Sequence, residues 1–262
     1  MFSCSDAIYD PSTMTANELD ALTDWLYPAH CQVFDGVTKD AFRAYVIEPD
    51  VLRTRIEVYT DPAGRAIGYT AIHLFERTVS GRRCLVVRME AGLTSELRSS
   101  GISMPFSMDE LVRCRRDFPD DEIYYLGCFV SPASYLLFSK CAPVSWPHPS
   151  VETPVETLSL MCALADSFDL TAPDPSRPLV RDVGWTLREG DADIGRFARS
   201  RRTEVRHYLD LNPDYTDGLG LLYLMPLGWD TLDAAASGGR SLLGARIRLM
   251  APERAPQGEL CL

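Results

Sequence analysis

The sequence predicts a mixed α/β (α+β) fold, in which a central, mostly antiparallel sheet is flanked by helices. Three strand-like runs, over residues 55–59, over residues 66–75 and around Cys84, follow one another with only short turns between them. A helical pattern that begins near Pro105 separates them from a fourth run, residues 123–130. Because short turns join antiparallel neighbours, this order indicates an antiparallel meander followed by a helical crossover to the next strand.

Two helices are expected before the meander. Thr15 and Glu18 have the spacing of a capping box, in which each side chain binds the backbone N–H of the other residue, so a helix should begin there and end near Pro28. A second helical pattern covers residues 39–47 and stops before Pro49, because a residue that precedes proline is disfavoured in the helical conformation.

The last third of the chain continues the alternation of strands and helices. We expect a helix over residues 155–168, a strand over residues 179–187, a helix over residues 193–211 and a strand over residues 220–227. The prediction is therefore a core of residues 1–145 and an elaborated C-terminal extension, residues 146–262, that completes or extends the same sheet.

Composition and charge narrow the classes of function. The chain has 262 residues, of which 46% are hydrophobic, and a formal net charge of -11. Such a charge argues against a nucleic-acid surface, and it fits either a cationic small substrate or simple solubility. Eight cysteines without a C-x-x-C pair and four scattered histidines favour reduced thiols over a metal site. Without a secretory leader or an apolar run of about 18 residues, a cytoplasmic protein that does not enter membranes is expected.

The loop before Pro105 has the composition of an anion site. Residues 93–103 read L-T-S-E-L-R-S-S-G-I-S, and proline suits the first turn of a helix, where its missing N–H costs no hydrogen bond. Backbone N–H groups at the positive end of a helix dipole bind phosphate, and Arg98 would add a permanent charge. An ordinary loop capped by serine explains the same residues.

The order of hairpin, strand, R-x-x-G-x-S loop, helix, strand and short helix resembles the GNAT superfamily of acyl-CoA N-acyltransferases. The family's loop reads R/Q-x-x-G-x-G/A, so Arg98 and Gly101 match and Ser103 departs from it. The resemblance covers residues 15–145 and implies that the loop binds the pyrophosphate of acetyl-CoA or another acyl-CoA. The residues that it assigns to the cofactor are Gly92, Leu93, Thr94, Arg98, Ser99, Ser100, Gly101, Ile102 and Ser103.

Glu90 is the candidate general base. Alternation along the strand puts it on one face with Val86 and Arg88, and puts Met89 and Ala91 on the other face. A carboxylate beside the thioester could take a proton from the acceptor amine, since only the neutral amine is nucleophilic. A solvated strand residue is the alternative interpretation.

The resemblance also implies an acid for the leaving thiolate, often a Tyr on the short helix in the pattern N-x-x-A-x-x-x-Y. The aligned residues are Ser131, Ser134 and Phe138, so the tyrosine is missing from its expected position. Tyr135, nearly one helical turn earlier, is the candidate substitute for protonating the sulfur of coenzyme A. A packed aromatic side chain is the alternative.

As a whole, the resemblance implies transfer of an acyl group, by default acetyl, from acyl-CoA to a small, cationic primary amine by direct attack, and it is compatible with a homodimer. The first two helices would flank the acceptor cleft. One alternative is a noncatalytic binding module that has lost its active site. Another is an acyl carrier protein as donor, docking on five arginines for which a solvated helix face is the favoured interpretation. These arginines are Arg196, Arg199, Arg201, Arg202 and Arg206.

Overall fold

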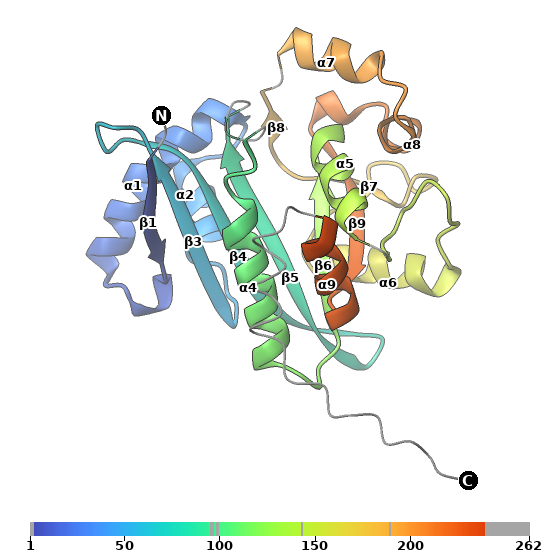
Figure 1. Cartoon of the computed structure of the whole chain (residues 1–262), viewed down its shortest axis with the longest axis horizontal. Coiled ribbons are helices and arrows are strands. Elements are labelled where there is room, and N and C mark those ends of the chain that lie inside the picture. Colours follow the sequence, from blue (N-terminus) through green and yellow to red (C-terminus); the bar gives the residue numbers. More distant parts are fainter. Residues whose placement is uncertain (1–2, 95–96, 98–99, 143, 189, 239–262) are drawn as a thin grey trace.

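A seven-stranded, mostly antiparallel sheet flanked by helices forms the fold, as the sequence predicts (Figure 1). The structure is a computed structural model, and it describes residues 3–238 apart from residues 95–96, 98–99, 143 and 189. The strands lie in the order β1 (Ser3–Tyr9), β3 (Arg53–Thr60), β4 (Ala66–Val79), β5 (Arg82–Leu93), β6 (Ile123–Phe129), β9 (Leu219–Pro226) and β7 (Val180–Asp182). Within the described residues, the neighbours in this sheet are antiparallel except β5 and β6.

Helices pack on both faces of the sheet. The first face is covered by α1 (Ala16–Val33), α2 (Lys39–Phe42), the π-helical segment η2 (Arg43–Ile47) and α6 (Val155–Asp166). The second face is covered by α4 (Met104–Asp117), α5 (Pro132–Cys141), α8 (Thr203–Leu211) and α9 (Trp229–Gly238). On β5, Val86 packs among residues of α6, whereas Val87 packs among residues of α4. The predicted alternation along this strand is therefore confirmed.

The capping box at the start of α1 is confirmed, but the predicted end of this helix is wrong. The hydroxyl of Thr15 accepts from the N–H of Glu18, whose carboxylate accepts from the N–H of Thr15. The helix runs past Pro28 to Val33. Tertiary packing outweighs the local cost of the proline, because His30 and Val33 in the last turn are buried.

Two predicted elements in the C-terminal third are each divided. The expected strand over residues 179–187 consists of β7 and β8 (Thr186–Leu187), and β8 pairs with β2 (Phe34–Asp35) in a separate two-stranded sheet. The expected helix over residues 193–211 consists of α7 (Asp191–Ala198) and α8. Short 3-10 turns lie at η1 (Pro11–Thr13) and η3 (Tyr215–Asp217). Since β9 lies between β6 and β7, this part of the chain joins the same sheet as the meander.

Strands β5 and β6 separate after a short region of pairing. Their parallel register covers three pairs and ends at Val87 and Tyr125. Beyond this point β5 pairs only with β4 as far as Leu93, and β6 pairs only with β9 as far as Phe129, among the described residues. The sheet therefore opens between these two strands, which diverge toward the end of the molecule that carries α7 and α8 (Figure 1).

Candidate functional site

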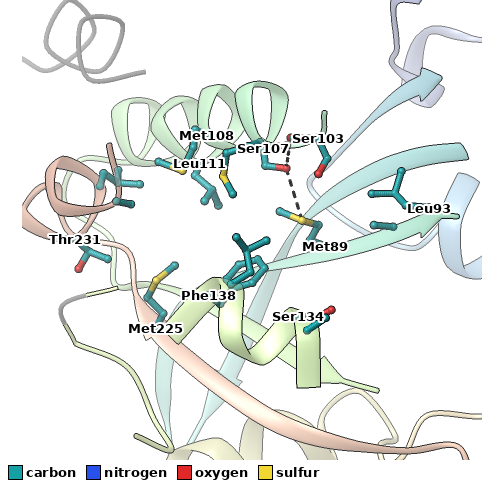
Figure 2. Close-up of a pocket in the computed structure, with 16 residues that line it drawn as sticks. Met89, Leu93, Ser103, Ser107, Met108, Leu111, Ser134, Phe138, Met225 and Thr231 are labelled. Atoms are coloured by element: carbon teal, nitrogen blue, oxygen red, sulfur yellow. Dashed lines mark hydrogen bonds between the residues drawn. The ribbon is translucent and has the colours of Figure 1, made fainter. Parts of the chain in front are cut away.

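An apolar cavity of about 150 Å³ lies on the second face of the sheet, where α4, α5 and α9 surround the end of β5 (Figure 2). Its lining includes four methionines, which fill irregular space with flexible side chains. The residues lining it are Met89, Ala91, Leu93, Ser103, Met104, Ser107, Met108, Leu111, Ala133, Ser134, Leu137, Phe138, Met225, Thr231, Leu232 and Ala235. None of them carries a charge, so an uncharged, apolar group is the natural occupant.

A smaller cavity of about 40 Å³ lies in the opening between β5 and β6. It is lined by Arg88 and Glu90 from β5, by residues 125–129 from β6, and by Trp185 from the segment before β8. Met89 lines both cavities. Because Arg88 and Glu90 face the opposite side of the strand from Met89, the two cavities approach one another through the opened sheet.

Glu90 belongs to a buried polar cluster in the smaller cavity. The hydroxyl of Tyr45 donates to Oε1 of Glu90 at 2.6 Å, and Arg88 donates from Nη2 to the same hydroxyl at 2.7 Å. Nη2 of Arg88 is 3.5 Å from Oε1 of Glu90. Burial raises the pKa of Glu90, and the nearby Arg88 charge and the Tyr45 hydrogen bond offset this only in part. A carboxylate with a raised pKa is better matched to proton transfer near neutral pH.

The structure describes part of the predicted cofactor loop. Arg98 and Ser99 lie outside the described residues. Gly101 has a left-handed φ of 71°, with open space around the position of a side chain. The hydroxyl of Ser100 closes the turn, because it donates to the carbonyl of Leu97 and accepts from the N–H of Ile102. The side chain of Ser100 is therefore engaged within the turn.

The predicted residues on either side of this turn differ in position. Leu93 and Ser103 line the large cavity, and Ser103 precedes α4 without capping it through its side chain. The positive end of the α4 dipole is therefore left without a side-chain acceptor from its own cap residue. Gly92 makes room for the ring of Tyr69, since a Cβ there would lie 2.4 Å from Cε1. Thr94 lines neither of the two cavities described.

The assignment of Tyr135 as the acid is not supported by its position. Its side chain is fully buried and its hydroxyl donates to the carbonyl of Pro147 at 2.8 Å. Burial also raises its pKa. Residues three apart on a helix differ by about 60° in direction, which is enough to turn Tyr135 toward Tyr208 while Phe138 faces the cavity. The position aligned with the family tyrosine therefore lies at the cavity, and it is a phenylalanine.

We expect Tyr135→Phe to lower the free energy of unfolding by about 1 kcal/mol and to leave turnover nearly unchanged. The reason is that this change removes one hydrogen bond and leaves the buried Pro147 carbonyl without a donor. Chemical denaturation and steady-state kinetics on the same preparation measure both effects. A fall in turnover of tenfold or more in a stably folded variant would restore Tyr135 as the acid.

Several residues of the site were missed by sequence reasoning. Helix α9 supplies Thr231, Leu232 and Ala235 to the large cavity. Trp229, Leu232 and Ala235 recur at a spacing of three, a helical pattern that could have indicated this element. No sequence signal joined Tyr45, on η2, to Glu90, because their contact depends on how the first helices pack against the sheet.

The arginines considered as a docking face all have exposed side chains on or between α7 and α8. Arg196 pairs with Asp193 and Arg206 pairs with Asp210, at N···O distances of 2.8 and 3.7 Å. Such exposed pairs contribute little to stability. The pairs fit the solvated helix face that was the alternative interpretation of this cluster.

Comparisons with known proteins give no family for this chain. A scan against protein-family models finds no match, and a search of curated proteins also finds none. Within the described residues, no cluster of three or more His, Cys, Asp or Glu side chains has the arrangement of a metal site. Across the same part of the chain, no helix has the length and apolar character needed to span a membrane.

Proposed function

We propose that this protein is an N-acyltransferase that moves an acyl group from acyl-CoA to a small primary amine. The observation that carries the proposal is the opening between β5 and β6, with an uncharged cavity on one side, a cavity containing Glu90 on the other, and Met89 bordering both. The exposed strand edge left by such an opening offers backbone groups to the amides of a pantetheine arm. This arrangement is what the resemblance to the GNAT superfamily leads one to expect.

In the proposed reaction, donor and acceptor approach the opening from opposite faces of the sheet. Glu90 takes one proton from the acceptor ammonium, and the neutral amine attacks the thioester carbonyl carbon. A C–N bond forms, the C–S bond breaks, and the nitrogen loses its second proton, which the leaving thiolate of coenzyme A takes up through water. Most of the rate enhancement comes from holding the two reactants in position.

The acceptor side has the features of a site for a small cation. Glu90 supplies a carboxylate, and Trp185 and Tyr45 pack edge to face with their ring centroids 4.9 Å apart beside it. Arg88 lines the same cavity and lies over the Tyr45 ring, with its Cζ 5.5 Å from the ring centroid. The ring of Trp185 and the carboxylate of Glu90 are the groups left to favour an ammonium. A cytoplasmic location, where acyl-CoA and reduced thiols such as Cys84 and Cys128 occur together, belongs to the same proposal.

The cofactor half of the proposal is tested by Gly101→Glu. We expect this variant to lose affinity for coenzyme A at least tenfold in calorimetric titration, because the new carboxylate would meet the pyrophosphate at the start of α4. Gly64→Glu is the matched control. Gly64 lies in the turn between β3 and β4, has a φ of 78° and is also surrounded by open space, so it brings the same backbone strain and charge.

Unchanged binding in Gly101→Glu and in Arg98→Ala, or no binding of coenzyme A by the wild type, would contradict the proposal. Binding of coenzyme A without turnover of any amine would favour the noncatalytic module. Salt-sensitive binding of an acidic acyl carrier protein, lost on charge reversal of Arg199, Arg201 and Arg202, would favour the carrier-protein donor.

A further inference from the structure

The large cavity is poorly suited to a polar occupant. Of its sixteen lining residues, four carry a polar group, the hydroxyls of Ser103, Ser107, Ser134 and Thr231. The Ser107 hydroxyl already donates to the carbonyl of Ser103 at 2.7 Å. The remaining walls are hydrocarbon and thioether. An amide held among these walls would lose most of its hydrogen bonds to water, because only a few hydroxyls could replace them, and this loss costs several kcal/mol in an apolar environment.

The lack of hydrogen-bond partners distinguishes the cavity from the strand edge beside it. The pantetheine arm of coenzyme A carries two amides, which need partners such as the backbone groups of the opened edge of β5. The cavity extends away from that edge, between α4 and α5, toward Met225 and Thr231 (Figure 2). At this far end α9 packs against both α4 and α5 and contributes Leu232 and Ala235 to the lining. The cavity is therefore a hydrocarbon-lined extension of the proposed donor site.

We propose that the acyl group that this protein transfers carries an alkyl chain of about six carbons, and that the cavity between α4, α5 and α9 holds it. The inference rests on the proposed function and replaces acetyl, its default acyl group, with a longer one. The length follows from the volume, since an apolar cavity of about 150 Å³ accommodates a molecule of the size of benzene. The alkyl chain passes Met89, where the thioester lies, and ends near Met225.

Chain length should therefore control affinity strongly. Each methylene that moves from water into the cavity should increase the affinity for the acyl-CoA about fourfold. Hexanoyl-CoA has four more methylenes than acetyl-CoA, so it should bind on the order of 100-fold more tightly. Alkyl chains much longer than the cavity should gain no further affinity, because the volume of about 150 Å³ is then filled and the excess methylenes stay in water. The four methionines adapt to the chain by changing rotamer, which permits neighbouring lengths.

The test is calorimetric titration of the full chain with coenzyme A and with acetyl-, butanoyl-, hexanoyl- and dodecanoyl-CoA. A rise in affinity from acetyl to hexanoyl, with no further gain at dodecanoyl, supports the inference. Equal affinity for all of these thioesters and for coenzyme A itself would overturn it and would leave the proposed function standing. No binding of any of them would remove the proposed function as well.

Two variants test where the alkyl chain of the acyl group lies. Ala235→Phe fills the far end of the cavity and should bring the ratio of the affinities for hexanoyl-CoA and acetyl-CoA down to about one. Ala234→Phe, one residue earlier on α9 and outside the lining, is the matched control. Met225→Ala enlarges the same end and should move the preference to a longer chain. If both variants fold and leave the chain-length profile as in the wild type, the chain does not lie in this cavity.

Discussion

Glu90→Gln should lower the turnover number by about 100- to 10,000-fold, which is the usual contribution of a positioned acid or base. Glutamine keeps the size of the side chain and can still accept the hydrogen bond from Tyr45, but it cannot take a proton from the acceptor ammonium. The affinity for the acyl-CoA should change little, because Glu90 lines the smaller cavity and not the larger one. Steady-state kinetics and calorimetric titration measure the two quantities separately.

The dependence of rate on pH gives a second readout for the same residue. In the wild type, the rate should rise with pH through the pKa of Glu90, which burial raises above its ordinary value of 4.5. In Glu90→Gln this rise should disappear. Glu76→Gln is the control, because Glu76 lies on the neighbouring strand β4 and pairs at the surface with Arg83. A wild-type rate and pH profile in Glu90→Gln would remove Glu90 from the mechanism.

The sequence was sufficient to predict the side of the sheet on which Glu90 lies. Local rules determined this result: alternation along an extended strand fixes which residues share a face, and short turns fix the antiparallel order of β3, β4 and β5. The start of α1 followed in the same way from the hydrogen bonds between Thr15 and Glu18. Each of these features depends on residues close together in the chain.

The features that the residues by themselves did not show depend on distant segments. Strand β6 separates from β5 after Tyr125 and stays paired along its other edge with β9, which comes from the C-terminal third. Helix α9, which lines the far end of the cavity, also lies far along the chain from α4 and α5. Tyr135 had two interpretations, and the choice between them required the position of Pro147, which accepts its hydrogen bond. Propensity and periodicity contain none of this information.

Acidification below about pH 6.5 should destabilise the fold, because two histidines are buried in neutral form. Burial lowers the pKa of His30 from 6.5 to about 4. Burial, with the charge of Arg88, lowers the pKa of His73 from 6.5 to about 3. The rings bind Tyr69 and Thr54 through Nδ1, at 2.8 and 3.0 Å, and Nε2 of each is buried without a partner among the described residues. A proton added to Nε2 would have no acceptor there.

The direction in which stability changes with pH follows from the protonation of the two histidines in the folded and the unfolded chain. Above pH 6.5 both rings are neutral in the folded and the unfolded chain, and the full stability is present. Below it the unfolded chain binds protons first, so stability is lost at about 1.4 kcal/mol per pH unit for each histidine. Glu90 acts in the opposite direction, since its raised pKa makes the folded chain take up a proton more readily. The net loss at pH 5 should be about 2 to 4 kcal/mol.

Denaturant unfolding at pH 7 and at pH 5 measures the loss of stability. Variants of single histidines then show which side chain causes it. His30→Gln and His73→Gln keep a polar group for Tyr69 or Thr54 but cannot titrate, so each should reduce the pH slope by about one proton. His207 acts in the same direction, because burial also lowers its pKa. Asp10 and Asp117, whose pKa values are lowered, act below about pH 4, outside this window. A stability that stays constant between pH 7 and pH 5 would show that protons reach both rings in the folded state.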